Sequence, residues 1–356
     1  MAASKIKVLI IDDSALVREV LTGLLGKDKD LEVVGTARDP MEAIDKIKKY
    51  KPDVLSLDLQ MPKMDGLTFL KKLMSNHPLP VIVVSSLTRE GSKETLKAIE
   101  LGAVDFVAKP KVGINSGLEE MKTEIIEKLK NAANISRQEI KRQNRKNHLR
   151  QNSKDSTKAP QNMSIDTTIE VIAIGASTGG TVAVRNILEK LPADMPGIIV
   201  VLHMPAAFTT SYAESLNNSC AMNVKEAENG EEFKKGTVYI APGDKHLTLE
   251  QGVSGYFFKL DQGPKIHHVR PAVDKTFVSI ADIVAPNCIG IILTGMGEDG
   301  AEGLAKMHRR NALTIAQDKE TSVVFGMPQK AIEKGVVDEV LSLNRIPKFL
   351  IEKLSN

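Results

Sequence analysis

Residues 174 to 180 read Ile-Gly-Ala-Ser-Thr-Gly-Gly, and this stretch decides how the second half of the chain is interpreted. It follows the apolar run of residues 169–173 and precedes a segment with helical character, which predicts a strand, a tight turn and a helix. A G-x-S-x-G turn in this context lifts a serine hydroxyl out at the carboxyl end of a sheet. We therefore predict that Ser177 is a nucleophile. Two alternatives stay open from these residues alone: a turn without a catalytic role, and a glycine loop that holds a phosphate.

The composition is that of a globular protein of about two domains. Of 356 residues, 42% are hydrophobic and 26% are charged, and the net charge is only +3. No global basic field therefore favours nucleic acid or a membrane surface as a partner. No apolar run approaches the roughly 20 residues of a membrane helix, and no secretory signal is evident, which predicts a cytoplasmic protein. Cys220 and Cys288 stand alone, so we expect buried free thiols.

In the first 110 residues, five strand-like apolar runs alternate with helical segments. One helix has a clear start signal in Asp39-Pro40-Met41-Glu42, which combines an N-cap, a first-turn proline and an acid. The carboxyl ends of parallel strands line one crevice, where ligands bind. The polar residues that follow four of the runs are Asp12, Asp13, Asp58, Ser85 and Lys109.

This set of side chains has the chemistry of a phosphoryl site. Clustered carboxylates repel one another unless a hard cation such as magnesium lies among them. The cation and a lysine can balance the charge of a phosphoryl group, for which a carboxylate can be the acceptor. Each residue taken alone could instead be a helix cap or a solvated charge, but all five at strand ends, in order, favour the functional interpretation.

On these residues, the chain from about 5 to 130 resembles the receiver domain of two-component response regulators. The resemblance implies a flavodoxin-like fold and a histidine kinase as phosphodonor. The implied roles are phosphoacceptor for Asp58, magnesium binding for Asp12, Asp13 and Asp58, and contact with the phosphoryl group for Ser85 and Lys109. Ser85 is preferred to Ser86 because it comes first after the strand. The Lys109-Pro110 step also matches the cis-type pattern of that family.

Beyond the last receiver helix the composition changes. Residues 131–168 hold almost no apolar side chains, and residues 137–150 contain six basic residues against the single acid Glu139. Such a segment cannot bury enough surface to fold alone and is predicted to be a linker. A solvated spacer is preferred to a tether that binds nucleic acid or an acidic surface. The predicted organisation is a receiver at 1–130, a linker at 131–168 and a second domain at 169–356.

The second domain offers partners for Ser177 at two further strand ends. The apolar run of residues 197–202 ends directly at His203, and the run of residues 288–293 leads into a glycine-rich loop that contains Asp299. If the strands are parallel, a serine, a histidine and an aspartate reach one edge, which is the set needed for acyl transfer. Their chain order differs from the order Ser, Asp, His of α/β-hydrolases, so the usual topology of that fold is not expected.

Other residues compete for these roles. His246, His267 and His268 are alternative bases, and Asp299 could simply cap the helix that follows it. The glycines at 295, 297 and 300 leave backbone amides near a developing oxyanion, and the amide of Met296 is the tentative contact. A dinucleotide loop would need glycine at position 177, and no helix-turn-helix pattern supports a DNA-binding output domain.

Six stretches of the second half resemble the catalytic domain of the chemotaxis protein-glutamate methylesterase family, CheB. They are IGASTGG at 174–180, HMP at 203–205, YIAPGDKH at 239–246, RPAVD at 270–274, TGMGEDG at 294–300 and VVFGMP at 323–328. The resemblance implies Ser177 as nucleophile, His203 as base and Asp299 as orienting acid, without a cofactor. Two departures from the family pattern are Leu202, where glutamine is common, and Val269, which separates His268 from Arg270.

The two resemblances together predict an α/β protein with two doubly wound, mostly parallel sheets. The second domain is expected to be Rossmann-like, with an antiparallel extension from the short strands within residues 236–260. The implied reaction is hydrolysis of glutamyl methyl esters, and deamidation of certain glutamines, on methyl-accepting chemotaxis receptors. We further expect the unphosphorylated receiver to cover Ser177 until Asp58 is phosphorylated.

Overall fold

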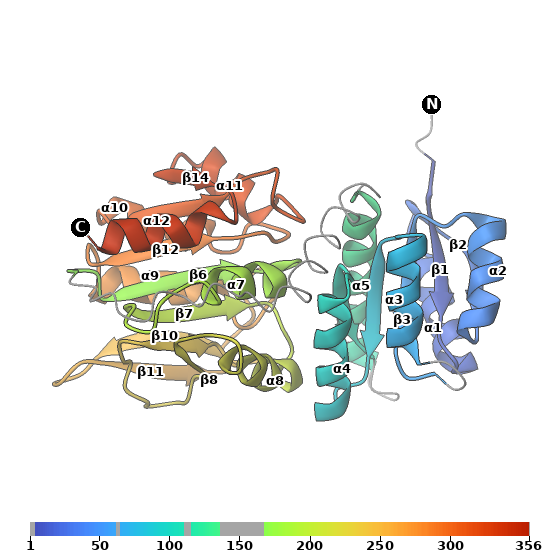
Figure 1. Ribbon diagram of the computed structural model, residues 1–356, viewed down its shortest axis with the longest axis horizontal. Helices are drawn as coiled ribbons and strands as arrows, with labels where there is room; N and C mark the ends of the chain where they lie inside the picture. Colours follow the sequence, from blue (N-terminus) through green and yellow to red (C-terminus); the bar gives the residue numbers. More distant parts are fainter. Residues whose placement is uncertain (1–3, 62–64, 110–114, 136–166, 356) are drawn as a thin grey trace. The chain divides into compact units, whose positions relative to one another are not determined.

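The computed structural model describes residues 4–61, 65–109, 115–135 and 167–355. The chain divides into two units, residues 1–156 and 157–356, each built around a parallel sheet (Figure 1). Most of the predicted linker at 131–168 lies outside the described residues, and so does Pro110 of the Lys109-Pro110 step. In the described ranges, no helix combines the length and the apolar character that crossing a membrane requires.

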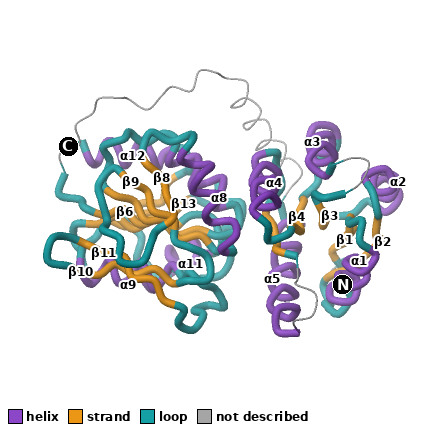
Figure 2. The backbone as a smooth tube through the Cα atoms, turned by 90° about the horizontal axis from the view of Figure 1, so that it is seen from below, coloured by secondary structure: helices purple, strands orange, loops and turns teal. Residues whose placement is uncertain are grey.

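The first unit is a five-stranded parallel sheet in the order β2-β1-β3-β4-β5. Its strands are β1 (Ile6–Ile11), β2 (Leu31–Ala37), β3 (Val54–Asp58), β4 (Val81–Ser85) and β5 (Asp105–Ala108). Its helices are α1 (Ala15–Leu25), α2 (Pro40–Tyr50), α3 (Gly66–Asn76), α4 (Arg89–Glu100) and α5 (Asn115–Ala133). Figure 2 shows α2, α3 and α4 on one side of the strands and α1 and α5 on the other. Strands β3 and β4 are buried at every residue and β1 is buried from Val8 to Ile11, as expected inside a parallel sheet, whereas β2 at the sheet edge is only partly buried.

The predicted start of α2 is confirmed. The Asp39 side chain accepts the Glu42 amide at 2.9 Å, and the Glu42 carboxylate accepts the Arg38 amide at 2.9 Å. These two bonds satisfy amide groups that a helix start would otherwise leave without acceptors.

The second unit is a seven-stranded sheet in the order β14-β13-β12-β6-β7-β9-β8, and all its neighbouring strands are parallel. Its strands are β6 (Val171–Ala176), β7 (Gly197–Leu202), β8 (Asn223–Glu226), β9 (Thr237–Ile240), β12 (Cys288–Ile292), β13 (Leu313–Gln317) and β14 (Glu339–Leu341). Its helices are α7 (Gly180–Leu188), α8 (Ala206–Asn217), α9 (Val273–Ile283), α10 (Ala301–Arg309), α11 (Met327–Glu333) and α12 (Arg345–Leu354). Helices α12 and α9 lie on opposite sides of the strands (Figure 2).

The predicted fold class is confirmed, and one detail of the hairpin differs from the expectation. Strands β10 (His246–Gln251) and β11 (Tyr256–Asp261) pair with each other as a separate antiparallel sheet. Strand β9, which was grouped with them, instead pairs in parallel with β7 and β8. All four residues of β9 are buried, as a strand inside a parallel sheet requires, whereas β10 and β11 are only partly buried and pack an apolar face on the core.

In both sheets the chain adds strands on one side of its first strand and then, after a reversal, on the other side. In the first unit the point of reversal lies between β1 and β3, and in the second it lies between β6 and β12. Open α/β sheets bind ligands at the carboxyl ends of the strands beside such a point. At the first point, Asp12 follows β1 and Asp58 is the last residue of β3; at the second, Ser177 follows β6.

Candidate active site

Ser177 and His203 stand at the ends of neighbouring parallel strands. The pairing of β6 with β7 ends at Ala176 and Leu202, so the next residue on each strand is a member of the predicted triad. The His203 amide donates to the Ala176 carbonyl at 3.4 Å. On the other side, the Ser177 amide donates to the Thr294 carbonyl, beyond the end of β12, at 3.0 Å. The serine therefore lies between the strand that leads to the histidine and the loop that carries the aspartate.

The packing around Ser177 explains why glycines flank it, without a bound phosphate. The Ser177 carbonyl accepts the Gly180 amide at 2.7 Å, which closes the turn into α7. Gly179 has a φ of 77°, and a Cβ there would lie 2.7 Å from Cβ of Val323. The strained geometry and the close neighbour together exclude a side chain at this position. Close packing therefore accounts for the glycine at position 179.

His203 and Asp299 form a buried hydrogen-bonded pair. His203 Nε2 and Asp299 Oδ2 are 2.8 Å apart, and the two side chains are 11% and 2% exposed. An ionised carboxylate only accepts hydrogen bonds, so Nε2 carries the proton and Nδ1 is the basic nitrogen. In the common triad arrangement the aspartate bonds Nδ1 instead. Here the aspartate bonds Nε2, so Nδ1 is the nitrogen left for the predicted role as base.

The start of α9 holds the Asp299 carboxylate in place. Oδ2 accepts the Val273 amide at 2.7 Å, and Oδ1 accepts the Asp274 amide at 2.9 Å. Burial acts to raise the pKa of Asp299, but the hydrogen bond and charge of His203 and the two amides outweigh it, so the pKa is lowered. Asp299 is therefore an ionised acceptor whose position is set by a helix N-terminus.

The serine–histidine bond is not formed in this structure. Among the described residues, no hydrogen bond joins Ser177 Oγ to the His203 ring, although the two residues occupy adjacent strand ends. Such bonds are commonly long without substrate and tighten when the substrate binds. The structure thus preassembles the histidine–aspartate half of the predicted triad.

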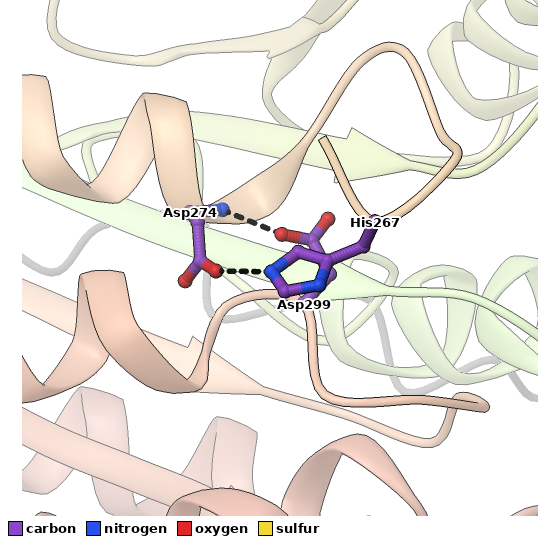
Figure 3. Close-up of side chains that lie close together, drawn as sticks. All are labelled: His267, Asp274 and Asp299. Atoms are coloured by element: carbon purple, nitrogen blue, oxygen red, sulfur yellow. Dashed lines mark hydrogen bonds and ion pairs between the residues drawn. The ribbon is translucent and has the colours of Figure 1, made fainter. Parts of the chain in front are cut away.

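The competing histidines have other partners or positions. His246 is fully buried, its Nε2 lies 2.9 Å from the Pro264 carbonyl, and its Nδ1 accepts the Ala272 amide at 3.2 Å. Both nitrogens are committed, so His246 is a structural residue. His267 Nε2 lies 2.9 Å from Asp274 Oδ2 (Figure 3), and His268 is exposed.

The two departures from the family pattern lie beside the site. Leu202 is buried, and its Cδ2 lies 2.9 Å from where a Cβ on Gly180 would stand, so it packs behind the serine turn. Val269 closes the turn that carries His267, by a pair of backbone hydrogen bonds with Ile266 at 3.2 and 3.0 Å. Neither residue displaces a member of the triad.

Gly175→Ala is expected to lower the free energy of unfolding by about 1–3 kcal/mol. A Cβ at this position in β6 would lie 2.3 Å from Cγ1 of Val273, so α9 would have to move. Because α9 holds Asp299, any activity at this site should fall together with stability. Urea unfolding measures the change, with Gly23→Ala in α1 as control, since Gly23 has no neighbouring atom within 4 Å of the added carbon and no positive φ. A Gly175→Ala protein as stable as the wild type would contradict this packing argument.

In the first unit, the predicted phosphoryl-site residues gather at the sheet edge. Lys109 Nζ donates to Asp58 Oδ2 at 2.7 Å and lies 3.0 Å from Asp12 Oδ2. Burial raises the pKa of Asp58, and the charge of Asp12 adds to this effect, while Lys109 opposes both. Ser85 is also at this edge, but its hydroxyl donates to the Gly91 carbonyl at 3.3 Å and not to the acidic cluster.

The residues at this edge fit a magnesium ion. Asp12, Asp13 and Asp58 each offer an oxygen, and these atoms lie within 4.8 Å of one another. Asp12 Oδ2 is buried and makes no hydrogen bond among the described residues, despite its closeness to Lys109. Two buried carboxylates, Asp12 and Asp58, share the single Lys109 ammonium, and a hard cation would balance the remaining negative charge.

The fold and the two sites define a class: a response regulator whose receiver is joined to an α/β output domain with a serine, a histidine and an aspartate at one sheet edge. The CheB methylesterase profile matches residues 172–350, and the response regulator receiver domain profile matches residues 8–115. The chain belongs to the CheB methylesterase family.

Full-length relatives and one solved structure agree with this assignment. A protein-glutamate methylesterase/protein-glutamine glutaminase 1 of Geobacter metallireducens is 48% identical over 353 residues, covering 98% of this chain and 96% of the relative. A protein-glutamate methylesterase/protein-glutamine glutaminase of Salmonella typhimurium is 47% identical over 352 residues, covering 99% and 98%. The crystal structure of the Thermotoga maritima CheB methylesterase catalytic domain has a TM-score of 0.51 at 48% identity, covering 52% of this chain and 98% of that one.

Proposed function

We propose that this chain hydrolyses glutamyl methyl esters, and deamidates specific glutamines, on methyl-accepting chemotaxis receptors in the cytoplasm. The buried His203–Asp299 pair beside the Ser177 turn carries the proposal, because it supplies a base with a fixed tautomer next to a candidate nucleophile. The full-length relatives, named for the methylesterase and glutaminase activities, support the choice of substrate bond.

The proposed reaction has two halves. Ser177 Oγ attacks the ester carbonyl while His203 Nδ1 takes the hydroxyl proton, and the ion pair with Asp299 steadies the imidazolium. The C–O bond breaks, and methanol leaves with the proton that His203 returns. Water then attacks the acyl-serine with His203 again as base, which frees Ser177 and leaves a glutamate carboxylate. With a glutamine substrate the leaving group is ammonia. The backbone amide of Met296 is the proposed oxyanion contact.

The receiver is proposed to regulate this reaction through Asp58. Lys109 would pair with the phosphoryl group on Asp58, and Ser85 would contact it after releasing the Gly91 carbonyl. Asp12, Asp13 and Asp58 would hold magnesium, which offsets negative charge when bound. The phosphodonor is a histidine kinase in this proposal. The unphosphorylated receiver covers Ser177, and phosphorylation uncovers it.

Asp58→Asn is expected to remove the response to a phosphodonor while basal esterase activity persists. The amide cannot accept a phosphoryl group, and the change leaves the second domain intact. The assay measures methanol release from methylated receptor with and without a small-molecule phosphodonor, and phosphate incorporation in parallel.

Asp53→Asn is the matched control, because Asp53 is an acid of the same unit whose carboxylate accepts the Lys7 amide at 2.8 Å and is not part of the acidic cluster. EDTA should abolish phosphate incorporation and leave basal methanol release unchanged. Equal rates with and without phosphodonor in the wild-type protein would refute the regulatory claim.

A further inference from the structure

A second carboxylate–imidazole pair lies beside the first. His267 Nε2 is 2.9 Å from Asp274 Oδ2, and Asp274 is only 8% exposed (Figure 3). Figure 3 also shows the bond from the Asp274 amide to the Asp299 carboxylate, which is 2.9 Å long. The two acids that accept from histidines are therefore directly connected through the backbone of α9.

The two carboxylates each accept from the start of the other's helix. Asp299 comes just before α10 and accepts the first amides of α9, as described above. Asp274 belongs to α9 and accepts the Gly303 amide in the first turn of α10 at 2.7 Å. The N-cap residues of both helices, Ala272 and Gly300, provide no side-chain acceptor. Asp299 thus takes the place of a capping side chain for α9, and Asp274 does so for α10.

A strained turn presents His267 to Asp274. His267 and His268 have φ values of 50° and 64° and are the two central residues between Ile266 and Val269. Positive φ at a residue other than glycine is unfavourable and persists only where surrounding contacts impose it. Burial and the charge of Asp299 raise the pKa of Asp274, while the Gly303 amide and His267 act against this rise. The His267 contact therefore favours the ionised, accepting form of Asp274.

The geometry favours a hydrogen-bonded network here over a metal site. His267, Asp274 and Asp299 are close enough to hold a cation. However, both oxygens of Asp274 and both oxygens of Asp299 already accept hydrogen bonds from the groups named above. A cation would have to displace those donors, including His203.

We propose that Asp274 is a positioning residue for the reaction at Ser177, because it joins the starts of α9 and α10 and thereby fixes the Asp299 carboxylate toward His203. The proposal rests on the proposed function and adds a residue to it. Asp299 lies on a loop between β12 and α10, so its direction depends on how α10 is held against α9. Without the Asp274–Gly303 bond, the loop gains freedom and the His203–Asp299 bond is formed for a smaller fraction of the time.

The test compares full-length Asp274→Ala and Asp274→Asn proteins in the methanol-release assay. We expect Asp274→Ala to lower kcat by about 10- to 100-fold with little change in KM, because misplacement of a catalytic group by about 1 Å can cost about 100-fold. Asp274→Asn keeps an oxygen that can accept the Gly303 amide, so its kcat should stay within about 5-fold of the wild type. The conservative variant Asp274→Asn is thus expected to keep most of the kcat that Asp274→Ala loses.

Asp338→Ala is the matched control, because Asp338 has the same kind of partners away from the triad. Its Oδ2 accepts the Thr314 amide at 2.8 Å, and its Oδ1 lies 3.3 Å from His308 Nε2. This variant should lose stability and keep its kcat. A second readout is the far-downfield proton NMR signal of the His203 Nε2 proton, which should weaken in Asp274→Ala and persist in Asp338→Ala.

The outcomes separate this inference from the proposed function. If Asp274→Ala retains wild-type kcat and the NMR signal while Ser177→Ala is inactive, the positioning role is wrong and the esterase assignment stands. Equal losses of kcat in Asp274→Ala and Asp338→Ala would also overturn it, since they would reflect general destabilisation. Should Asp274→Ala fail to fold, Asp274→Ser takes its place with the same expected result, because the shorter hydroxyl cannot span both partners.

Discussion

Ser177→Ala is expected to lower kcat for methanol release from methylated receptor by a factor on the order of 10⁴ or more, as in other serine triads. Alanine has no oxygen to attack the ester carbonyl, so the acyl intermediate cannot form. The loss should appear in kcat and not in KM, because the strand ends and the turn that shape the site remain. The same variant should lose glutamine deamidation by a similar factor, since both reactions are proposed to pass through the same acyl-serine.

The matched control for this variant is Ser215→Ala. Ser215 lies on α8 and accepts a hydrogen bond from Arg185 at 2.7 Å, so the change removes a hydroxyl and a local contact without touching the triad. Its kcat should stay within about 2-fold of the wild type, as expected for a substitution away from the site. Retained activity in a correctly folded Ser177→Ala protein would mean that another residue is the nucleophile.

Asp299→Asn is expected to lower kcat by a factor of about 10⁴. If the new amide nitrogen faces His203 Nε2, the ring must accept there, and its proton moves to Nδ1. The nitrogen that should take the Ser177 proton is then blocked. If the amide is turned the other way, its nitrogen faces the Asp274 amide, which is also a donor. Both orientations are unfavourable because every partner of the Asp299 carboxylate donates.

Kinetics and a structural readout together test this variant. The far-downfield signal of the His203 Nε2 proton should disappear, and kcat should fall without a comparable rise in KM. Asp318→Asn is the control, since Asp318 Oδ1 accepts the Thr321 amide at 2.9 Å in a loop outside the triad. An Asp299→Asn enzyme that keeps more than about a tenth of the wild-type kcat would show that Asp299 does not orient the base.

Much of the fold could be predicted because its signals are local. The runs that became β1, β3, β4, β6, β7 and β12 are continuous stretches of apolar residues, and a polar or catalytic candidate follows each of them. The start of α2 was readable from four consecutive residues. The predicted antiparallel pairing of β9 is wrong, because a short apolar run gives no information about whether its neighbour is parallel or antiparallel.

The role proposed for Asp274 was missed for a related reason. The residue appeared in the sequence only as the last letter of the stretch RPAVD, and an acid at the start of a helix is ordinarily a favourable first-turn charge. Its partners, His267 and Gly303, lie 7 and 29 residues away along the chain. One sequence feature could have indicated this role. Helices α9 and α10 both begin after a residue, Ala272 or Gly300, whose side chain cannot cap the helix.

The sequence by itself determined the two-domain α/β architecture, and it placed Ser177 and His203 after buried strands, because burial of a continuous apolar run is a property of the run itself. Only the tertiary structure decided how the residues at that edge are used. It showed that His203 turns Nε2 toward Asp299, that His246 has both nitrogens occupied, and that Asp299 is held by α9. These features depend on which donors face which acceptors across segments as far as 96 residues apart, and hydrogen-bond direction is a property of the packed structure.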